Sequence, residues 1–408
     1  MRFVQEGSAA ADAVSVREFA RVFWVFLRLG LTSFGGPIAH LAYFRTEFVE
    51  RRNWLDDASY AELLALCQFL PGPASSQLGM AIGMRQAGLM GALAAWIGFT
   101  LPSALLMFAF ALGLLHTELA AIKSALHGLL IVAVSVVGHA VYNMAKSLCP
   151  DRLRASIAVL ACSFCMLVQG SLAQLLAIVI AGFAAGFLMP RDPTPVAFAR
   201  MAPTSGKPRA LICLTLFFLL LVGLPWLAWL YAEPWLQLMD GFYRAGALVF
   251  GGGHVVLPLL QAMLVPSGHL DADRFLAGYA AAQAMPGPLF SLAAFLGAVI
   301  PGFSPSWFGS LMALLFIFLP GFLLVIGVLP FWSGLVQNAA IARSLAGINA
   351  AVVGILLASL YDPIFVHAIR EPVHFVVALL GFALLSIARL SPLWLVLLTV
   401  LTACLVDL

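Results

Sequence analysis

The sequence predicts an all-α membrane protein that crosses the bilayer many times and is built from two related halves. Of its 408 residues, 63% are hydrophobic and only 10% are charged, whereas soluble domains carry about 25% charged residues. Many apolar stretches reach about 18 residues, the length at which a helix can cross the hydrocarbon core. Two further observations support the prediction: an internal repeat, and a pair of helix breaks that recurs in both halves.

The composition and motifs exclude several other classes. The net charge of +3 is small and spread over loops, so no nucleic-acid partner is expected. The chain has no phosphate-binding loop, dinucleotide fingerprint or intramembrane metal cluster, so no enzymatic activity, cofactor or metal is expected. Cys162 and Cys165 form a C-x-x-C pair in an apolar span. Buried small side chains are the favoured interpretation, and a redox pair that reduces a substrate is the alternative.

The chain divides into five parts. We expect a cytoplasmic N-terminal tail over residues 1–15, with no apolar core of a cleavable signal peptide, and a first membrane repeat over 16–189. A proline-rich, basic cytoplasmic linker follows at 190–209. A connecting transmembrane helix is predicted at 210–232 and a second membrane repeat at 233–408.

The two repeats share motifs at a nearly constant spacing. Gln68-Phe-Leu-Pro71-Gly72-Pro73 returns as Gln283-Ala-Met-Pro286-Gly287-Pro288, and Phe34-Gly35-Gly36 returns as Phe250-Gly251-Gly252. The offset stays between 215 and 219 over more than 100 residues, which indicates a duplication. The single extra crossing at 210–232 would turn the second repeat over. The prediction is therefore an inverted-topology repeat, the architecture of many secondary transporters.

Nine to 13 membrane crossings are compatible with the apolar segments. If every segment spans, 13 crossings result, and about 14 Lys and Arg residues lie inside against 6 outside. If the Phe-Gly-Gly and Pro-Gly-Pro segments are re-entrant hairpins in both halves, nine crossings remain and the split is about 16 against 4. The nine-crossing arrangement is favoured, and both arrangements place the N-terminus in the cytoplasm.

Each break predicts a helix that starts inside the membrane. Pro71 and Pro73 donate no backbone N–H, and Gly72 can adopt a positive φ. Such a break is tolerated in a bilayer only against protein or a wet cavity. Gly followed by Pro is a helix-start signal, and the free N–H groups of a helix start bind anions. Four such starts near a pseudo-twofold axis would form a donor-rich pocket for a compact oxyanion.

The residues expected to bind this anion belong to the four breaks or lie beside them. They are Ser33, Gly35, Gly36, Pro37, Gln68, Gly72, Pro73, Ser75, Ser76, Gln77, Gly251, Gly252, Gly253, Gln283, Gly287 and Pro288. Serine hydroxyls and glutamine amides add donors to the backbone N–H groups. Gly253 stands where the first half has Pro37, so the two Phe-Gly-Gly breaks are expected to differ in geometry.

Six ionisable residues are candidates for charge compensation or proton coupling: Arg28, Arg85, Arg244, His40, His254 and Glu47. Arg28 and Arg244 occupy matched positions and either face the anion or snorkel to the interface; Arg85 faces either the anion path or the cytoplasm. The histidines follow the Phe-Gly-Gly breaks at non-equivalent positions, so a hydrogen-bonded structural role is favoured over proton coupling. Glu47 lies in a charged loop, where solvation is favoured.

Phe34-Gly35-Gly36-Pro37 followed by His40-Leu41, with Phe69-Leu70-Pro71-Gly72-Pro73 and its second copy, resembles the chromate ion transporter family. The likeness is to its long, two-domain bacterial members and covers the chain from about residue 14. It implies a multi-pass protein of the bacterial inner membrane that expels chromate and confers chromate resistance. The implied partners are chromate or sulfate and the lipid bilayer, and a homodimer is compatible. Sulfate uptake or exchange and an anion channel are the alternatives.

Overall fold

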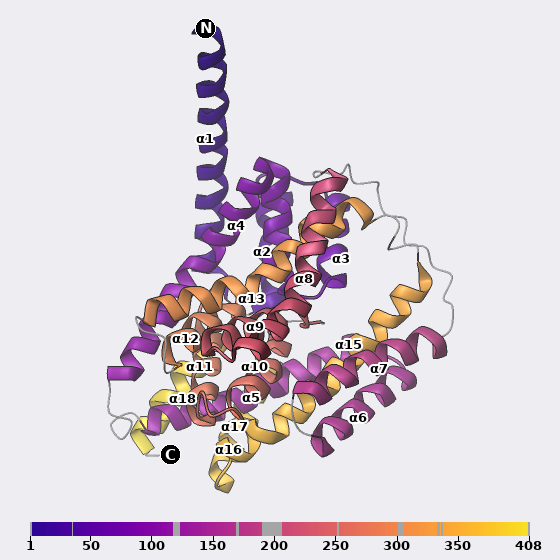
Figure 1. Ribbon diagram of the computed structural model, residues 1–408. Helices are drawn as coiled ribbons and strands as arrows, with labels where there is room; N and C mark the ends of the chain where they lie inside the picture. The colour runs from indigo at the N-terminus through magenta and orange to yellow at the C-terminus, as the bar shows by residue number, and fades with distance from the viewer. Residues whose placement is uncertain are drawn as a thin grey trace.

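The computed structural model describes residues 2–34, 36–116, 123–168, 171–189, 206–250, 253–300, 306–332, 335 and 338–406 (Figure 1). Within these ranges the chain forms helices joined by turns, with no β-strand. The all-α prediction is confirmed. The boundaries predicted inside residues 190–205 lie outside the described residues.

Within the described ranges, the first half and the connecting helix contain eight α-helices. They are α1 (Arg2–Thr32), α2 (Gly36–Arg45), α3 (Asp57–Phe69), α4 (Ala74–His116), α5 (Lys123–Leu148), α6 (Arg152–Leu167), α7 (Ser171–Leu188) and the connecting α8 (Lys207–Tyr231). A π-helical turn, η1 (Thr46–Arg51), extends α2. Residues 2–15, predicted as a separate tail, form the first part of α1, and this N-terminal part projects away from the other helices in Figure 1.

The second half repeats this order. It contains α9 (Pro234–Ala247), η3 (Gly253–Val255), α10 (Val256–Leu264), α11 (Ala272–Ala284), η4 (Leu289–Ser291), α12 (Leu292–Val299), α13 (Ser306–Val328), η5 (Leu329–Phe331), α15 (Ala339–Ser359), η6 (Leu360–Phe365), α16 (Val366–Ala368), α17 (Pro372–Ser386) and α18 (Pro392–Val406). Asp56 and Asp271 illustrate the repeat. Each caps its helix, α3 or α11, by accepting a backbone N–H bond from the residue three positions later, at 2.7 and 2.9 Å.

Helix α4 is two helices joined by a sharp reversal. Ala87 and Gly88 leave the helical conformation, and Gly88 has a φ of 59°. Beyond the reversal the two parts pack closely, because a Cβ on Gly83 would lie only 2.2 Å from the carbonyl oxygen of Gly91. We call residues 74–86 the short part of α4 and residues 89–116 its long part. Only the long part, about 42 Å at 1.5 Å per residue, can cross the bilayer.

The segments around the first-half breaks are re-entrant hairpins. Arg21, past the middle of α1, lies over the ring of Trp54, 5.1 Å from its centroid, so this part of α1 and the segment after η1 share one face. The pKa of Asp56 at the start of α3 is held below its usual value, first by the Ser59 N–H and also by the charge of Arg85. Arg85 ends the short part of α4, so this hairpin also opens on that face, which we call the N-terminal face.

The second-half breaks lie in two similar hairpins. A Cβ on Gly241 of α9 would collide with Met263 of α10, so the two arms lie side by side. Gly278 of α11 is packed in the same way against Phe295 of α12. The arms have 8 to 14 residues, so none reaches the roughly 20 residues needed to cross the hydrocarbon core.

The two pairs of hairpins open on opposite faces. The long part of α4 ends on the face opposite the N-terminal face, and α5 begins seven residues later on that same face (Figure 1). His127, near the start of α5, is 3.3 Å from His374 of α17. His374 accepts a bond from the Arg370 N–H, and Arg370 pairs with Asp273, in the first turn of α11, at 3.8 Å. Helix α11 therefore begins on the opposite face, which makes the second half an inverted copy of the first.

The remaining helices lock the halves together by reciprocal packing. Helices α6 and α7 of the first half pack against α15 of the second, whereas α17 and α18 of the second half pack against α5 of the first. Among the described residues, five helical stretches have the length and composition to cross a membrane, and they include the long part of α4, α5, α8, α13 and α15. Counting the shorter α6, α7, α17 and α18, which have 15 to 18 residues, as crossings gives the number in the nine-crossing arrangement.

Candidate functional site

The breaks of opposite halves are hydrogen-bonded to each other. The Gly72 N–H donates to the carbonyl of Val249, which precedes the second Phe-Gly-Gly motif, at 2.6 Å. The Gly287 N–H donates to the carbonyl of Ser33, which precedes the first, at 2.9 Å. Gly72 and Gly287 are 215 residues apart, and Ser33 and Val249 are 216 apart, so the two bonds are related by the repeat. His40 joins the two pairs, because its ring contacts both the Ser33 carbonyl and the Ser75 hydroxyl, so all four breaks are linked.

Glycine is required at both Pro-Gly-Pro tips. Gly72 has a φ of 125° and Gly287 a φ of 97°, backbone conformations that other residues rarely adopt. Space is also short: a Cβ would lie 2.8 Å from Nε2 of Gln77 at the first tip and 2.9 Å from Oγ of Ser103 at the second. Gly36 also has a positive φ, 77°, at the start of α2. Gly35, Gly251 and Gly252 lie outside the described residues.

Helices start directly after both Pro-Gly-Pro motifs, one position later than the sequence suggests. The first helical bond of α4 runs from the Gln77 N–H to the Pro73 carbonyl at 2.9 Å, so Pro73 is the N-cap. Pro288 caps η4 in the same way, accepting from the Ser291 N–H at 3.0 Å. The N–H groups between cap and first bond have no partner within their own helix. The N–H groups of the tip glycines donate to the opposite half, so the backbone donors available to bind an anion belong to the residues after each proline.

Four buried hydroxyl groups near the breaks have no hydrogen-bond partner in the described part of the chain. They belong to Ser33, Ser76, Thr100 and Ser291, which are at most 2% exposed. Ser76 and Ser291 are 215 residues apart and occupy the same position after their Pro-Gly-Pro motifs. Sequence reasoning missed Ser291 and Thr100. The repeat offset applied to Ser76 would have found Ser291, whereas nothing in the sequence marks Thr100.

The glutamines expected to act as donors differ in their surroundings. Gln77 donates through Nε2 to the Pro71 carbonyl at 2.8 Å, so one of its two amide hydrogens already holds the break together. Gln283 is buried, and its Nε2 lies 3.3 Å from Nδ1 of His254. Gln68, its repeat partner, is exposed. The matched pair therefore does not form a symmetric set of donors.

Both histidines are buried or half-buried and hydrogen-bonded beside the breaks. His40 lies with Nε2 3.2 Å from the Ser33 carbonyl and Nδ1 3.4 Å from the Ser75 hydroxyl. Because a carbonyl only accepts, Nε2 carries the proton and Ser75 donates to Nδ1. His254 lies 2.9 Å from the hydroxyl of Tyr279 on α11. Each histidine thus ties a Phe-Gly-Gly hairpin to the Pro-Gly-Pro hairpin of its own half.

The candidate arginines are not equivalent. Arg28 is exposed on α1, on the same helical face as the exposed Trp24, whereas Arg244 forms an ion pair with Asp240, whose carboxylate is buried. Arg85 is exposed at the N-terminal face, at the far end of the short part of α4 from the break. The charge of Arg244 is already compensated within α9, which sequence matching did not reveal.

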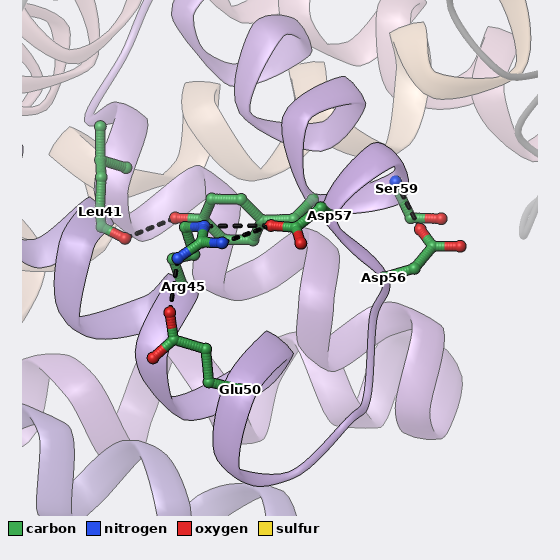
Figure 2. A network of polar contacts seen from close by, with 7 residues as sticks. Leu41, Arg45, Glu50, Asp56, Asp57 and Ser59 are labelled. Atoms are coloured by element: carbon green, nitrogen blue, oxygen red, sulfur yellow. Dashed lines mark hydrogen bonds and ion pairs between the residues drawn. The ribbon is translucent and has the colours of Figure 1, made fainter.

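The acidic loop after α2 is less solvated than expected. The side chain of Glu47 is only 9% exposed and pairs with Arg52 at 2.7 Å and Arg51 at 3.6 Å, so its interpretation as a solvated residue is wrong. Figure 2 shows the neighbouring network, in which Arg45 joins Glu50 at 2.5 Å to Asp57 of α3 at 2.7 Å. These contacts hold the open ends of the two first-half hairpins together.

The chemistry of the meeting point is that of a donor-rich, uncharged site. Serine and threonine hydroxyls and the first N–H groups of two helices gather there, and the glycine tips bring the backbone close. No group of three or more metal-ligating side chains occurs in the part of the chain that the structure describes. Fold and breaks together define a multi-pass helical membrane protein with paired re-entrant hairpins.

The chain belongs to the chromate transporter family. The model of that family matches residues 20–187 and again residues 236–404, once for each half. The chain is 28% identical over 376 residues to the chromate transport protein of Pseudomonas aeruginosa, covering 87% of this chain and 83% of that one. It is 29% identical over 373 residues to the chromate transport protein of Cupriavidus metallidurans, covering 90% and 86%.

Other relatives carry less specific names. An uncharacterized transporter of Methanocaldococcus jannaschii is 28% identical over 345 residues, 83% of this chain and 82% of that protein. No solved structure matches the chain. The arrangement of the breaks described above therefore has no experimental counterpart among the comparisons.

Proposed function

We propose that the protein is a secondary active transporter that expels chromate and thereby confers chromate resistance. The observation that carries the proposal is the reciprocal pair of bonds between the breaks, Gly72 to Val249 and Gly287 to Ser33. A site shared by two inverted halves can be exposed alternately to the two faces when one half rocks against the other. The chromate transport proteins among its relatives support the choice of substrate.

Chromate would be held by neutral donors at the hairpin tips. The unpartnered hydroxyls of Ser76 and Ser291, with the N–H groups at the start of α4 and η4, suit a tetrahedral dianion. Sulfate has the same shape and charge and would compete. The sequence given has no phosphate-binding loop for ATP, so we expect the energy to come from an ion gradient or from exchange.

The distribution of basic residues supports a cytoplasmic N-terminus. Arg21, Arg45, Arg52 and Arg85 lie on the N-terminal face, whereas Arg370 lies on the opposite face. Cytoplasmic segments carry the excess of Lys and Arg in multi-pass proteins. We expect the protein to reside in the bacterial inner membrane with the N-terminal face inside.

Labelling of single cysteines tests this orientation. In a background without the native cysteines, Arg51→Cys should react only from the cytoplasmic side and Ser267→Cys, in the exposed turn after α10, only from outside. Reaction of position 51 from outside would instead require the 13-crossing arrangement, because that arrangement places the loop after η1 on the opposite face from the N-terminus.

Transport is tested in proteoliposomes that contain the purified protein. We expect saturable chromate flux that depends on a counter-ion or a gradient and is reduced by sulfate. Gly72→Leu and Gly287→Leu should abolish it, because both tips lack room for a side chain, whereas Gly223→Leu on α8, with open space around it, should not. Chromate flux that survives in both tip variants contradicts the proposed binding site. A current that does not saturate with chromate concentration indicates a channel, and net uptake of sulfate supports the sulfate transporter alternative.

A further inference from the structure

A cavity of about 540 Å³ lies between the end of α7 and the start of α15, away from the breaks. Its walls include Phe183, Gly186, Phe187, Ala340, Arg343 and Ser344. Helix α7 belongs to the first half and α15 to the second, so the cavity lies on the seam between the halves. Close packing continues the seam deeper, where a Cβ on Gly347 would lie 2.2 Å from that of Ala185.

Arg343 gives this cavity an incomplete polar site. Its Nε donates to the Gly186 carbonyl at 3.1 Å, which fixes the guanidinium. Its Nη1 is buried and has no hydrogen-bond partner in the described structure. The Ser344 hydroxyl is adjacent, since it lies 2.7 Å from where a Cβ on Gly186 would be. Arg343 and Ser344 both line the cavity, and a fixed guanidinium beside a hydroxyl matches the oxygens of a phosphate group.

The other wall of the cavity is apolar and faces outward. Phe183 is 68% exposed and Phe187 is 86% exposed, and Ile180, one turn before Phe183, is 58% exposed. On a helix in a bilayer such residues contact acyl chains. The cavity therefore joins a phosphate-sized polar site to a strip of apolar surface that leads toward the hydrocarbon core.

The depth of the cavity also fits a lipid head group. Helix α15 runs toward Arg370 on the opposite face, so its start lies at the N-terminal face, at the membrane boundary. Asn338 caps α15 by accepting the Ala340 N–H at 3.0 Å, and the positive end of the helix dipole favours an anion there. Basic pockets between transmembrane helices at this level bind anionic head groups.

We propose that this cavity binds an anionic phospholipid, with its phosphate on Arg343 and Ser344 and an acyl chain along Phe183 and Phe187. The bound lipid joins α7 of one half to α15 of the other and stabilises the seam between them. This role does not depend on which anion the protein transports.

Lipid binding is tested by native mass spectrometry and thermal unfolding of the detergent-purified protein. Phosphatidylglycerol should bind and raise the melting temperature, whereas phosphatidylcholine should bind at least about tenfold more weakly because it lacks net charge. Arg343→Gln should lose this preference. Arg209→Gln, which removes an exposed arginine at the start of α8, should keep it.

Two further arms keep the test decisive. Inorganic phosphate alone should neither bind nor stabilise, because it lacks the apolar contact; stabilisation by phosphate equal to that by the lipid would identify a free-anion site instead. Phe187→Ala removes an exposed side chain and should fold normally yet bind phosphatidylglycerol more weakly, which covers the case in which Arg343→Gln fails to fold. The proposal is overturned if Arg343→Gln folds and keeps the lipid preference, or if Phe187→Ala binds phosphatidylglycerol as tightly as the wild type.

Discussion

Removing the hydroxyls of Ser76 and Ser291 should separate anion binding from folding. Both side chains are buried, at 2% and 1% exposure, and neither hydroxyl has a partner in the described structure. Alanine fits both positions without a cavity larger than the lost oxygen. The double substitution Ser76→Ala and Ser291→Ala therefore deletes two candidate ligand donors and no existing hydrogen bond.

The double substitution should change two quantities in different ways: the stability of the anion-free protein and its affinity for the anion. An unsatisfied buried hydroxyl costs about 1–3 kcal/mol, so each alanine should leave the free energy of unfolding of the anion-free protein unchanged or slightly higher. A hydrogen bond to a charged acceptor contributes about 1.5–3 kcal/mol, so each lost bond should weaken anion affinity by about ten- to 150-fold.

The measurement is a titration of the detergent-purified protein with chromate and sulfate, alongside thermal unfolding without either anion. Ser135→Ala is the matched control. Ser135 is equally buried, but its hydroxyl donates to the Ala378 carbonyl at 2.8 Å, so its loss should destabilise by about 0.5–1.5 kcal/mol and leave anion affinity unchanged. If the double variant melts lower yet binds both anions as tightly as the wild type, the hydroxyls are structural and the reasoning is refuted.

Three other predictions follow from the packing and charges. Gly72→Ala should destabilise the protein by about 1–3 kcal/mol, because φ is 125° at this position and a Cβ would lie 2.8 Å from the Gln77 side-chain nitrogen. As a control, Gly223→Ala on the open surface of α8 should raise the melting temperature, because alanine favours a helix more than glycine does. Arg244→Gln should lower the free energy of unfolding by about 3–5 kcal/mol, because Asp240 is left buried without its cation. Adding Asp240→Asn to this variant should restore most of the loss. No rescue in the double variant would contradict the pairing. The pKa of Asp56 is lower in the folded state, so its capping bond stabilises the fold above the usual carboxyl pKa and this stability is lost as pH falls through the lower folded value. The melting temperature of Asp56→Asn should therefore depend less on pH below about pH 4 than that of the wild type. Identical acid profiles would count against the cap.

Several features followed from the sequence because they depend on solvent and local geometry. A chain with 63% hydrophobic residues can satisfy its backbone in a bilayer only through helices or closed barrels, and its long apolar segments select helices. Proline and glycine act on their own backbone, so the breaks at residues 71–73 and 286–288 appeared where predicted. The duplication could be followed through matched motifs, and the family match to each half agrees with it.

Other features required the tertiary structure. Arg28 and Arg244 are indistinguishable by position in the repeat, yet one is exposed and the other is paired, because only α9 places a carboxylate one turn before the arginine. Glu47 belongs to a charged segment, but the bend of η1 brings two arginines onto it and buries it. In each case the deciding factor is which neighbour folding brings within a few ångströms.

The sequence by itself determined that this protein is a duplicated, multi-pass helical protein with paired breaks at membrane depth. The tertiary structure decided that the breaks are re-entrant tips and that each tip glycine bonds to the opposite half, Gly72 to Val249 and Gly287 to Ser33. The reason is physical: composition and periodicity indicate which solvent surrounds a segment and which local backbone conformation it adopts. A hydrogen bond between residues that lie 177 or 254 positions apart depends on how two inverted halves fit together.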